Sequence, residues 1–177
     1  MKDHILIKLD STTELLQYFT GSVNTTATTK KYASTGIGSG LAVGEKVVIA
    51  GFSNADSNGT KTLATVAANE ITVEEAIGAN ETGVTATVNQ EYQGEWKEVE
   101  QFSHLLAIEN TSGNAYAYVD QSADGVNTDY TTTITVTAAT AKADSIETVL
   151  PFARLRVRTN AADQTTMRAY LFGRRLT

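Results

Sequence analysis

In the stretch Phe152-Ala-Arg-Leu-Arg-Val-Arg158, arginines alternate with apolar side chains without a break. Successive side chains of a β-strand point to opposite faces of a sheet, so a strand here would place its arginines on one face and its apolar residues on the other. The same period of two recurs in Ala115-Tyr-Ala-Tyr-Val119 and across residues 131–137. Helical spacing is confined to residues 11–19, where an extended conformation fits equally well. We therefore expect an all-β fold.

Working outward from this strand, turn residues divide the rest of the chain into two β-rich parts. Further candidate strands of the second part lie at 96–99, 105–109, 115–119, 131–137 and 167–172, a spacing typical of an antiparallel sandwich or jelly roll. In the first part, short apolar runs at 46–50, 60–66, 71–73 and 84–88 are separated by glycines and by an Asn58-Gly59 turn. We expect residues 1–92 to hold an N-terminal strand and a small glycine-punctuated β-unit, and residues 93–177 to form an antiparallel β-sandwich or jelly roll.

The composition excludes several classes of function. The 177 residues contain no cysteine and only two histidines, which rules out disulfides and cysteine-based metal sites and disfavours an imidazole-rich metal site. The net charge of −6 disfavours a dedicated nucleic-acid binder, and no apolar run has the length of a transmembrane helix. We expect a protein that has neither a nucleic-acid nor a membrane partner and that lacks a cofactor.

No motif supplies catalytic residues, so we expect a protein that is not an enzyme. The glycine-rich turn at residues 36–40 lacks the Gly-Lys-Ser/Thr ending of a phosphate-binding loop, and no Gly-x-Ser-x-Gly elbow is present. Asp120-Gln-Ser122-Ala-Asp124-Gly125 matches the first half of a calcium loop, but the twelfth position is threonine where a bidentate glutamate is needed. Asp120, Ser122 and Asp124 are therefore only a weak calcium candidate, and a polar turn explains them better.

Arginine is confined to the C-terminal end of the chain, whereas residues 70–109 are rich in glutamate. Guanidinium groups grip carboxylates in bidentate fashion, so we name Arg154, Arg156, Arg158 and Arg168 as candidate interface residues for a neighbouring subunit. The alternative is an outer face whose arginines pair across strands with Glu95, Glu98 or Glu100 of the same domain. A second candidate surface is formed by Trp96, Tyr116 and Tyr118, whose rings would contact a glycan or pack in a core or interface.

The second part also carries a set of turn and strand motifs. They are Gly94-Glu-Trp-Lys-Glu-Val99, Gln121-Ser-Ala-Asp-Gly125, Phe152-Ala-Arg-Leu-Arg-Val-Arg-Thr-Asn160 and Gln164-Thr-Thr-Met-Arg168. This set resembles tailed-bacteriophage virion structural proteins, in which a "QSxDG" turn and an "(F/W)xRxRxxN" strand recur in a jelly-roll or sandwich domain. The segment that begins at Val47-Val-Ile-Ala-Gly-Phe-Ser-Asn54 and ends at Ile71-Thr-Val73 is similar to a small β-domain of phage head and tail proteins.

The resemblance implies an accessory role in the virion, as a capsid decoration (cement) protein, a fibre or a tail accessory protein, and it implies no catalytic residues. On this hypothesis the chain is made in the host bacterial cytoplasm, forms a homo-oligomer with a trimer favoured, and binds the major capsid protein or another virion protein. The alternative is a carbohydrate-binding module that recognises a receptor on behalf of a phage tail or fibre.

Overall fold

The computed structural model describes residues 4–160 and 162–176, which form antiparallel β-strands and, within those ranges, no α-helix. The all-β prediction is confirmed. The chain divides into two compact units. The sandwich unit comprises the residues up to Leu15 and those from Tyr92 onward, and the closed-sheet unit comprises Leu16–Glu91. Among the described residues, no helix is long and apolar enough to cross a membrane.

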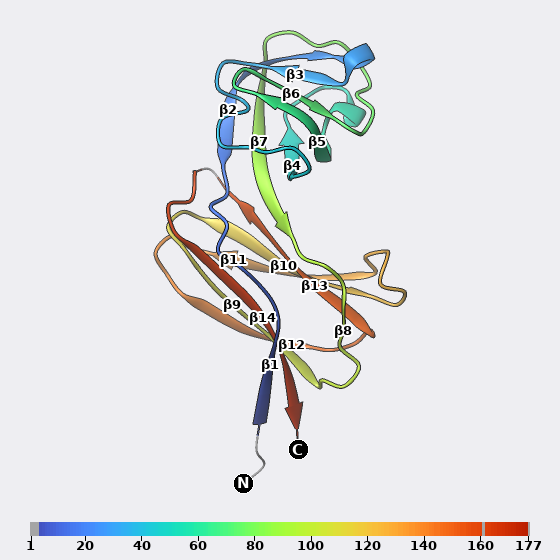
Figure 1. Ribbon diagram of the computed structural model, residues 1–177, viewed down its shortest axis with the longest axis vertical. Helices are drawn as coiled ribbons and strands as arrows, with labels where there is room; N and C mark the ends of the chain where they lie inside the picture. Colours follow the sequence, from blue (N-terminus) through green and yellow to red (C-terminus); the bar gives the residue numbers. More distant parts are fainter. Residues whose placement is uncertain (1–3, 161, 177) are drawn as a thin grey trace. The chain divides into compact units, whose positions relative to one another are not determined.

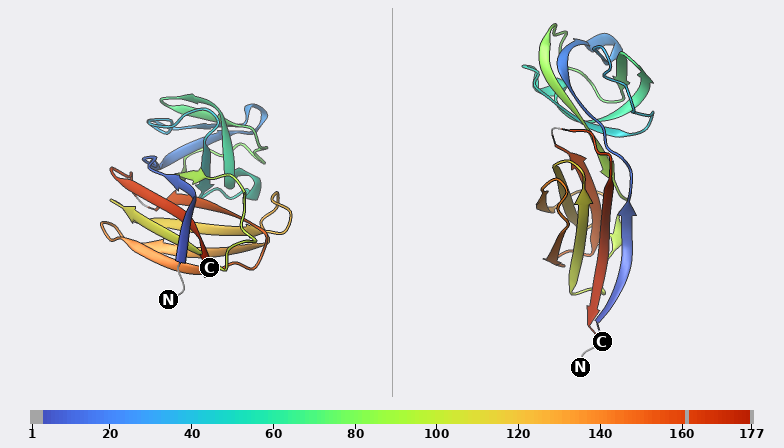
Figure 2. Two further views of the ribbon diagram at one scale, coloured as in Figure 1. Left: turned by 60° about the horizontal axis from the view of Figure 1, so that its bottom comes forward. Right: turned by 90° about the vertical axis from the view of Figure 1, so that its left-hand side faces the viewer.

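The sandwich unit consists of two sheets packed face to face (Figures 1 and 2). One sheet has the order β1 (His4–Thr12), β14 (Met167–Leu176), β9 (His104–Thr111), β12 (Lys142–Glu147). The other has the order β11 (Tyr130–Val136), β10 (Ala115–Ser122), β13 (Phe152–Thr159), and the short β8 (Lys97–Glu98) also pairs with β13. These eight strands follow the order of a jelly roll.

The alternation read from the sequence positions the core of the sandwich unit. On β13 the apolar residues Ala153, Leu155 and Val157 are fully buried, and the arginines between them lie on the outer face. Within the sandwich unit, sequence reasoning missed β12, because Lys142-Ala-Asp-Ser-Ile-Glu147 is mostly polar and buries only Ile146. An edge strand with a single core residue has too little apolar periodicity to be recognised.

The N-terminal strand belongs to a different unit from the one in which the sequence placed it. We expected residues 1–92 to form one domain, but β1 pairs with β14 along its whole length, from His4 opposite Leu176 to Thr12 opposite Ala169. The closed-sheet unit is therefore an insertion between the first two strands of the jelly roll. The second boundary, between Glu91 and Tyr92, lies within one residue of the predicted one.

The closed-sheet unit is a ring of six antiparallel strands. In order around the ring they are β7 (Val84–Gln93), β2 (Tyr18–Thr26), β3 (Lys31–Ala33), β6 (Glu70–Val73), β5 (Gly59–Ala67) and β4 (Lys46–Ala50), and β4 pairs again with β7. In the right-hand view of Figure 2 the strands run around the core as a ring. Val23, Tyr32, Val47, Leu63 and Ile71 are fully buried there.

The predicted hairpin between β4 and β5 exists, but its loop is longer than a two-residue Asn-Gly turn. A short 3-10 turn at Ala55–Ser57 intervenes, and Gly59 already begins β5. The Asn58 side chain holds the loop together by accepting from the Phe52 amide and donating to the carbonyls of Phe52 and Asn54. The side chain of Asn58, and not a tight turn at Asn58-Gly59, therefore orders this connection.

Candidate functional site

The outer face of the β11–β10–β13 sheet gathers most of the residues that the sequence singled out. The strand register sets three rows across this face. The rows are Thr135–Tyr116–Arg158, Thr133–Tyr118–Arg156 and Thr131–Asp120–Arg154. We call this set, together with Trp96, the arginine face. Each row is a cross-strand neighbourhood in which side chains on one face of a sheet touch.

Asp120 is the anchor of the arginine face. Its side chain is completely buried and accepts hydrogen bonds from Arg154 Nε at 3.0 Å, from Arg156 Nε at 2.6 Å and from Arg156 Nη2 at 2.9 Å. The Thr131 hydroxyl donates a further bond at 2.8 Å. Burial alone would raise the pKa of Asp120, but the hydrogen bonds and charge of Arg156, with the bonds from Thr131 and Arg154, outweigh it and hold the pKa below its ordinary value.

The guanidinium groups also stack on the aromatic rings of this face. The Arg154 guanidinium carbon lies 4.3 Å from the centre of the Trp96 ring, and that of Arg156 lies 4.7 Å from the centre of the Tyr118 ring. These distances are within the range of cation–π attraction. The candidate interface arginines of β13 and the candidate glycan-contact rings therefore form a single cluster of contacting side chains. The sequence had suggested two separate surfaces.

Arg158 differs from the other two arginines of β13. Its Nη2 atom donates to the Tyr118 hydroxyl at 2.8 Å, and its guanidinium lies 5.6 Å from the ring centres of both Tyr116 and Tyr118. Its Nε atom is buried and has no hydrogen-bond partner within the described part of the chain. Asp120 neutralises one charge of the Arg154–Arg156 pair, whereas Arg158 has no carboxylate partner among the described residues.

Two expectations about the arginines need correction. The acidic partner of Arg154 and Arg156 is Asp120, on the neighbouring strand β10, and not one of the glutamates proposed from the sequence; Glu95 pairs with Lys97 at 2.8 Å. Arg168 does not join the arginine face, because it lies on β14 in the opposite sheet, opposite Asn110 of β9. The partner of a charged strand residue depends on which strands are neighbours and in what register, and β10 and β13 are far apart in sequence.

The calcium-like loop is a hydrogen-bonded turn. Asp124 accepts bonds from the Val126 and Asn127 amides and from the Ser122 hydroxyl. Backbone hydrogen bonds from Asn127 and Val126, with those from the Asn127 and Ser122 side chains, lower the pKa of Asp124. Asp120 is committed to Arg154 and Arg156, whereas Ser122 and Asp124 bond to each other within the turn. Among the described residues, no group of three or more His, Asp or Glu side chains is placed to hold a metal ion.

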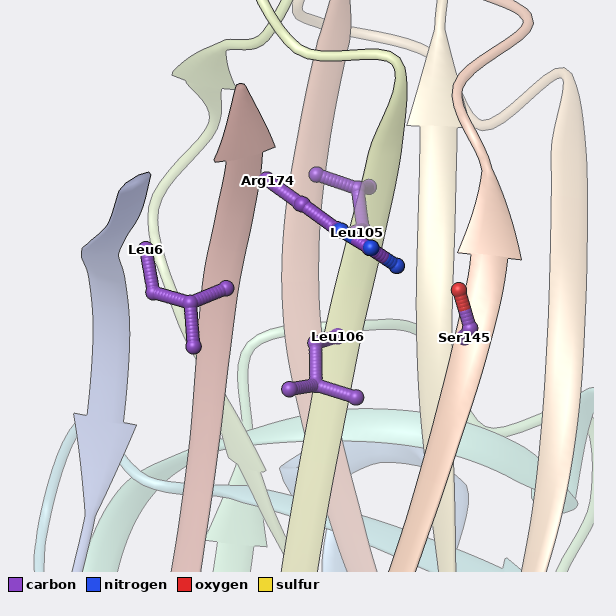
Figure 3. Close-up of a pocket in the computed structure, with 5 residues that line it drawn as sticks. All are labelled: Leu6, Leu105, Leu106, Ser145 and Arg174. Atoms are coloured by element: carbon purple, nitrogen blue, oxygen red, sulfur yellow. The ribbon is translucent and has the colours of Figure 1, made fainter. Parts of the chain in front are cut away.

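The outer face of the other sheet presents a different, more apolar surface. Figure 3 shows a hollow lined by Leu6, Leu105, Leu106, Ser145 and Arg174, which come from all four strands of that sheet. Leu6 is about half exposed, at 51%. Nearby on β14, the rings of Tyr170 and Phe172 stack with their centres 6.0 Å apart. The hollow is open and shallow, and sequence reasoning did not identify it.

Sequence reasoning also missed a buried acid. Glu109 on β9 is fully buried, and neither of its carboxylate oxygens has a hydrogen-bond partner among the described residues. Burial, and then the charge of Asp144, raise the pKa of Glu109 to about 8, against the opposing influence of Lys142. The alternation of side chains along β9 could have indicated this burial, because Glu109 lies on the same inward face as Leu105 and Ala107.

The arginine face is suited to binding by charge and stacking. It combines rigidly held guanidinium groups with aromatic rings on a partly exposed surface, a composition enriched at protein interfaces and their hot spots. No protein-family model and no curated protein matches this sequence.

Proposed function

We propose that this chain is a non-enzymatic structural protein of a tailed-bacteriophage virion that binds other virion proteins and further copies of itself. The observation that carries the proposal is the arginine face, where Arg154 and Arg156 are locked by the buried Asp120 and still leave 16% and 19% of their side chains exposed. A preorganised Arg–aromatic surface loses little side-chain entropy on binding. The motifs at residues 94–99, 121–125 and 152–168 support the virion context by their resemblance to phage structural proteins.

In this proposal the jelly roll is the scaffold and its outer faces make the contacts. The partners are the major capsid protein or another virion protein, and the chain itself forms a homo-oligomer, with a trimer favoured. Capsid decoration, fibre and tail accessory roles all belong to this class. Synthesis takes place in the host bacterial cytoplasm.

Immunogold labelling of intact phage particles tests the virion role. An antibody raised against the purified chain is applied to particles purified from lysates of the encoding phage, with pre-immune serum as the control. Uniform label over the capsid is expected for decoration, whereas label at one vertex or along the tail indicates an accessory role there. Particles that carry no label, in a preparation whose lysate contains the protein, would refute the proposal.

A carbohydrate-binding role is the second candidate, because Trp96, Tyr116 and Tyr118 lie on an outer face and are not part of the core. Aromatic rings at a surface are the usual platforms for sugar rings. The guanidinium groups of Arg154, Arg156 and Arg158 already lie against these rings, so a glycan would have to displace or flank them. Glycan-array binding that is lost in Tyr116→Ala would support this role, and an array without hits would remove it.

A further inference from the structure

We propose that Arg158 of one copy pairs with Glu98 of a second copy, and that this contact holds the homo-oligomer together. The inference rests on the self-association included in the proposed function, and it names the contact responsible. It follows from three features of the arginine face: an arginine without an acidic partner, an exposed glutamate at the opposite end, and the separation of the two residues.

The first feature is the unsatisfied state of Arg158. Arg154 and Arg156 share the carboxylate of Asp120, and the amide of Gln93, turned with its oxygen toward Arg154, accepts further bonds from that guanidinium. Arg158 donates one hydrogen bond, to the neutral Tyr118 hydroxyl, and its buried Nε has no partner among the described residues. Guanidinium groups bind carboxylates by charge-assisted hydrogen bonds. Within the described part of the chain Arg158 has no carboxylate partner, so its Nη groups retain the capacity to bind one.

The second feature is the position of Glu98. On β8, Glu98 is paired with Phe152, the first residue of β13. Directly paired residues point to the same side of a sheet, and Phe152 has the same parity along β13 as the arginines. Glu98 therefore lies on the arginine face, at the end away from Arg158. Its side chain is exposed and has no ion pair within the described part of the chain.

The third feature is that the two residues cannot meet within one chain. Six steps of extended chain separate Phe152 from Arg158, which is about 20 Å at about 3.3 Å per residue. A face with an unpaired cation at one end and an unpaired anion at the other is complementary to a second copy of itself. Such a contact serves both a two-fold pair, where it occurs twice, and a closed ring, where it repeats between successive subunits.

The second copy is favoured over an unrelated acidic partner because the arginine face itself carries an exposed glutamate, Glu98, at the end away from Arg158. The chain has a net charge of −6, so nonspecific encounters between copies are repulsive and need a local pair of opposite charges to fix their register. Glu100, two residues beyond Glu98, is also exposed and adds to the negative charge at that end of the face.

A charge-swap series tests the contact with the full-length protein in sedimentation velocity. Arg158→Glu and Glu98→Arg are each expected to weaken self-association by at least about tenfold, because each replaces an attractive pair by a repulsive one. The double variant, with both substitutions in one chain, is expected to restore the oligomer. The matched control is Arg168→Glu, which reverses an exposed arginine on the opposite sheet and should leave the oligomer mass unchanged.

Restoration is the decisive result, because a purely local role of Arg158 predicts none. The two side chains are too far apart to compensate within one chain, so a double variant that stays dissociated would overturn the proposal, as would a wild-type chain that is monomeric at its highest soluble concentration. Thermal melting of each variant separates unfolding from dissociation. Particle labelling is independent of this outcome. A labelled particle with a monomeric chain removes self-association and with it the Arg158–Glu98 contact, but leaves the virion role. Restoration without label removes only the virion role.

Discussion

Each sheet of the sandwich unit buries one carboxylic acid, and the two acids have opposite properties. Asp120, on β10, and Glu109, on β9, are both completely inaccessible to solvent. The pKa of Asp120 is lowered and that of Glu109 is raised to about 8. Burial is common to the two, so the difference lies in their partners. Asp120 has the guanidinium groups of Arg154 and Arg156, whereas the oxygens of Glu109 have no hydrogen-bond donor among the described residues.

The two acids therefore have different effects: the charge of Asp120 positions the arginines of a surface, whereas a charge on Glu109 would destabilise the core. A buried ion pair contributes little net stability, yet removing one partner is costly because the other charge stays buried. The main role of Asp120 is therefore to fix the positions of the Arg154 and Arg156 side chains on the arginine face. An uncompensated buried carboxylate, by contrast, is expected to take up a proton and remain neutral at pH values where an ordinary glutamate is ionised.

The largest effect is expected for Asp120→Ala. The substitution leaves Arg154 and Arg156 without their carboxylate, and we expect a loss of about 3–5 kcal/mol in the free energy of unfolding, measured by urea denaturation at neutral pH. Because the pKa of Asp120 is lowered in the folded state, its contribution is present above the unfolded pKa and declines as the pH falls through the folded one. The difference between wild type and variant should shrink in acid.

The matched control for this variant is Thr131→Val, which removes one hydrogen bond to Asp120 and keeps both arginine contacts. Its cost should be about 1 kcal/mol. If Asp120→Ala costs no more than Thr131→Val, the arginine face is not organised around the carboxylate.

The next effect in size is the pH dependence that Glu109 gives to stability. Its folded pKa of about 8 lies above the ordinary value of 4.5, so the folded state binds more protons. Stability from this group is fully present below pH 4.5 and is lost as the pH rises toward 8, by about 1.4 kcal/mol per pH unit, or about 3 kcal/mol at pH 7. Glu109→Gln should remove this slope, so that variant and wild type match near pH 4 and the variant is more stable at pH 8.

Urea denaturation of both proteins across this pH range measures the effect, and Glu100→Gln, at an exposed position, is the control that should leave the slope unchanged. A wild-type stability that stays flat between pH 5 and pH 8 would show that Glu109 finds a partner that lowers its pKa.

How much of this could be predicted from sequence depends on whether the information is local. Alternation along residues 152–158 correctly predicted a strand with its arginines on one face, because side-chain parity is a property of the strand itself. Glu109 has the same strand parity as Leu105 and Ala107, which would have placed it on the inward face, but sequence reasoning did not use this signal. The pairing of Asp120 with Arg154 and Arg156 joins residues more than 30 positions apart and depends on register.

The domain assignment failed for the same reason. The alternation of Ile5, Ile7 and Leu9 predicts a strand, yet nothing near them indicates that its partner is β14, at the far end of the chain. When only neighbouring sequence is considered, a strand is placed in the same domain as the strands that directly follow it. In a jelly roll the first and last strands are neighbours, so an insertion after the first strand separates it in sequence from its own sheet.

The smallest effect is expected for Arg158→Gln, and it distinguishes the arginines of β13 from one another. Arg158 contributes one hydrogen bond, to Tyr118, and has an unsatisfied buried Nε, so its removal should change the free energy of unfolding of the monomer by about 1 kcal/mol or less. Arg156→Gln, which breaks the two-atom contact with Asp120, should cost several times more. Urea denaturation of dilute, monomeric protein measures both. An equal cost for the two variants would place Arg158 in the structural network of Asp120 and remove the reason for regarding it as the arginine available to a partner.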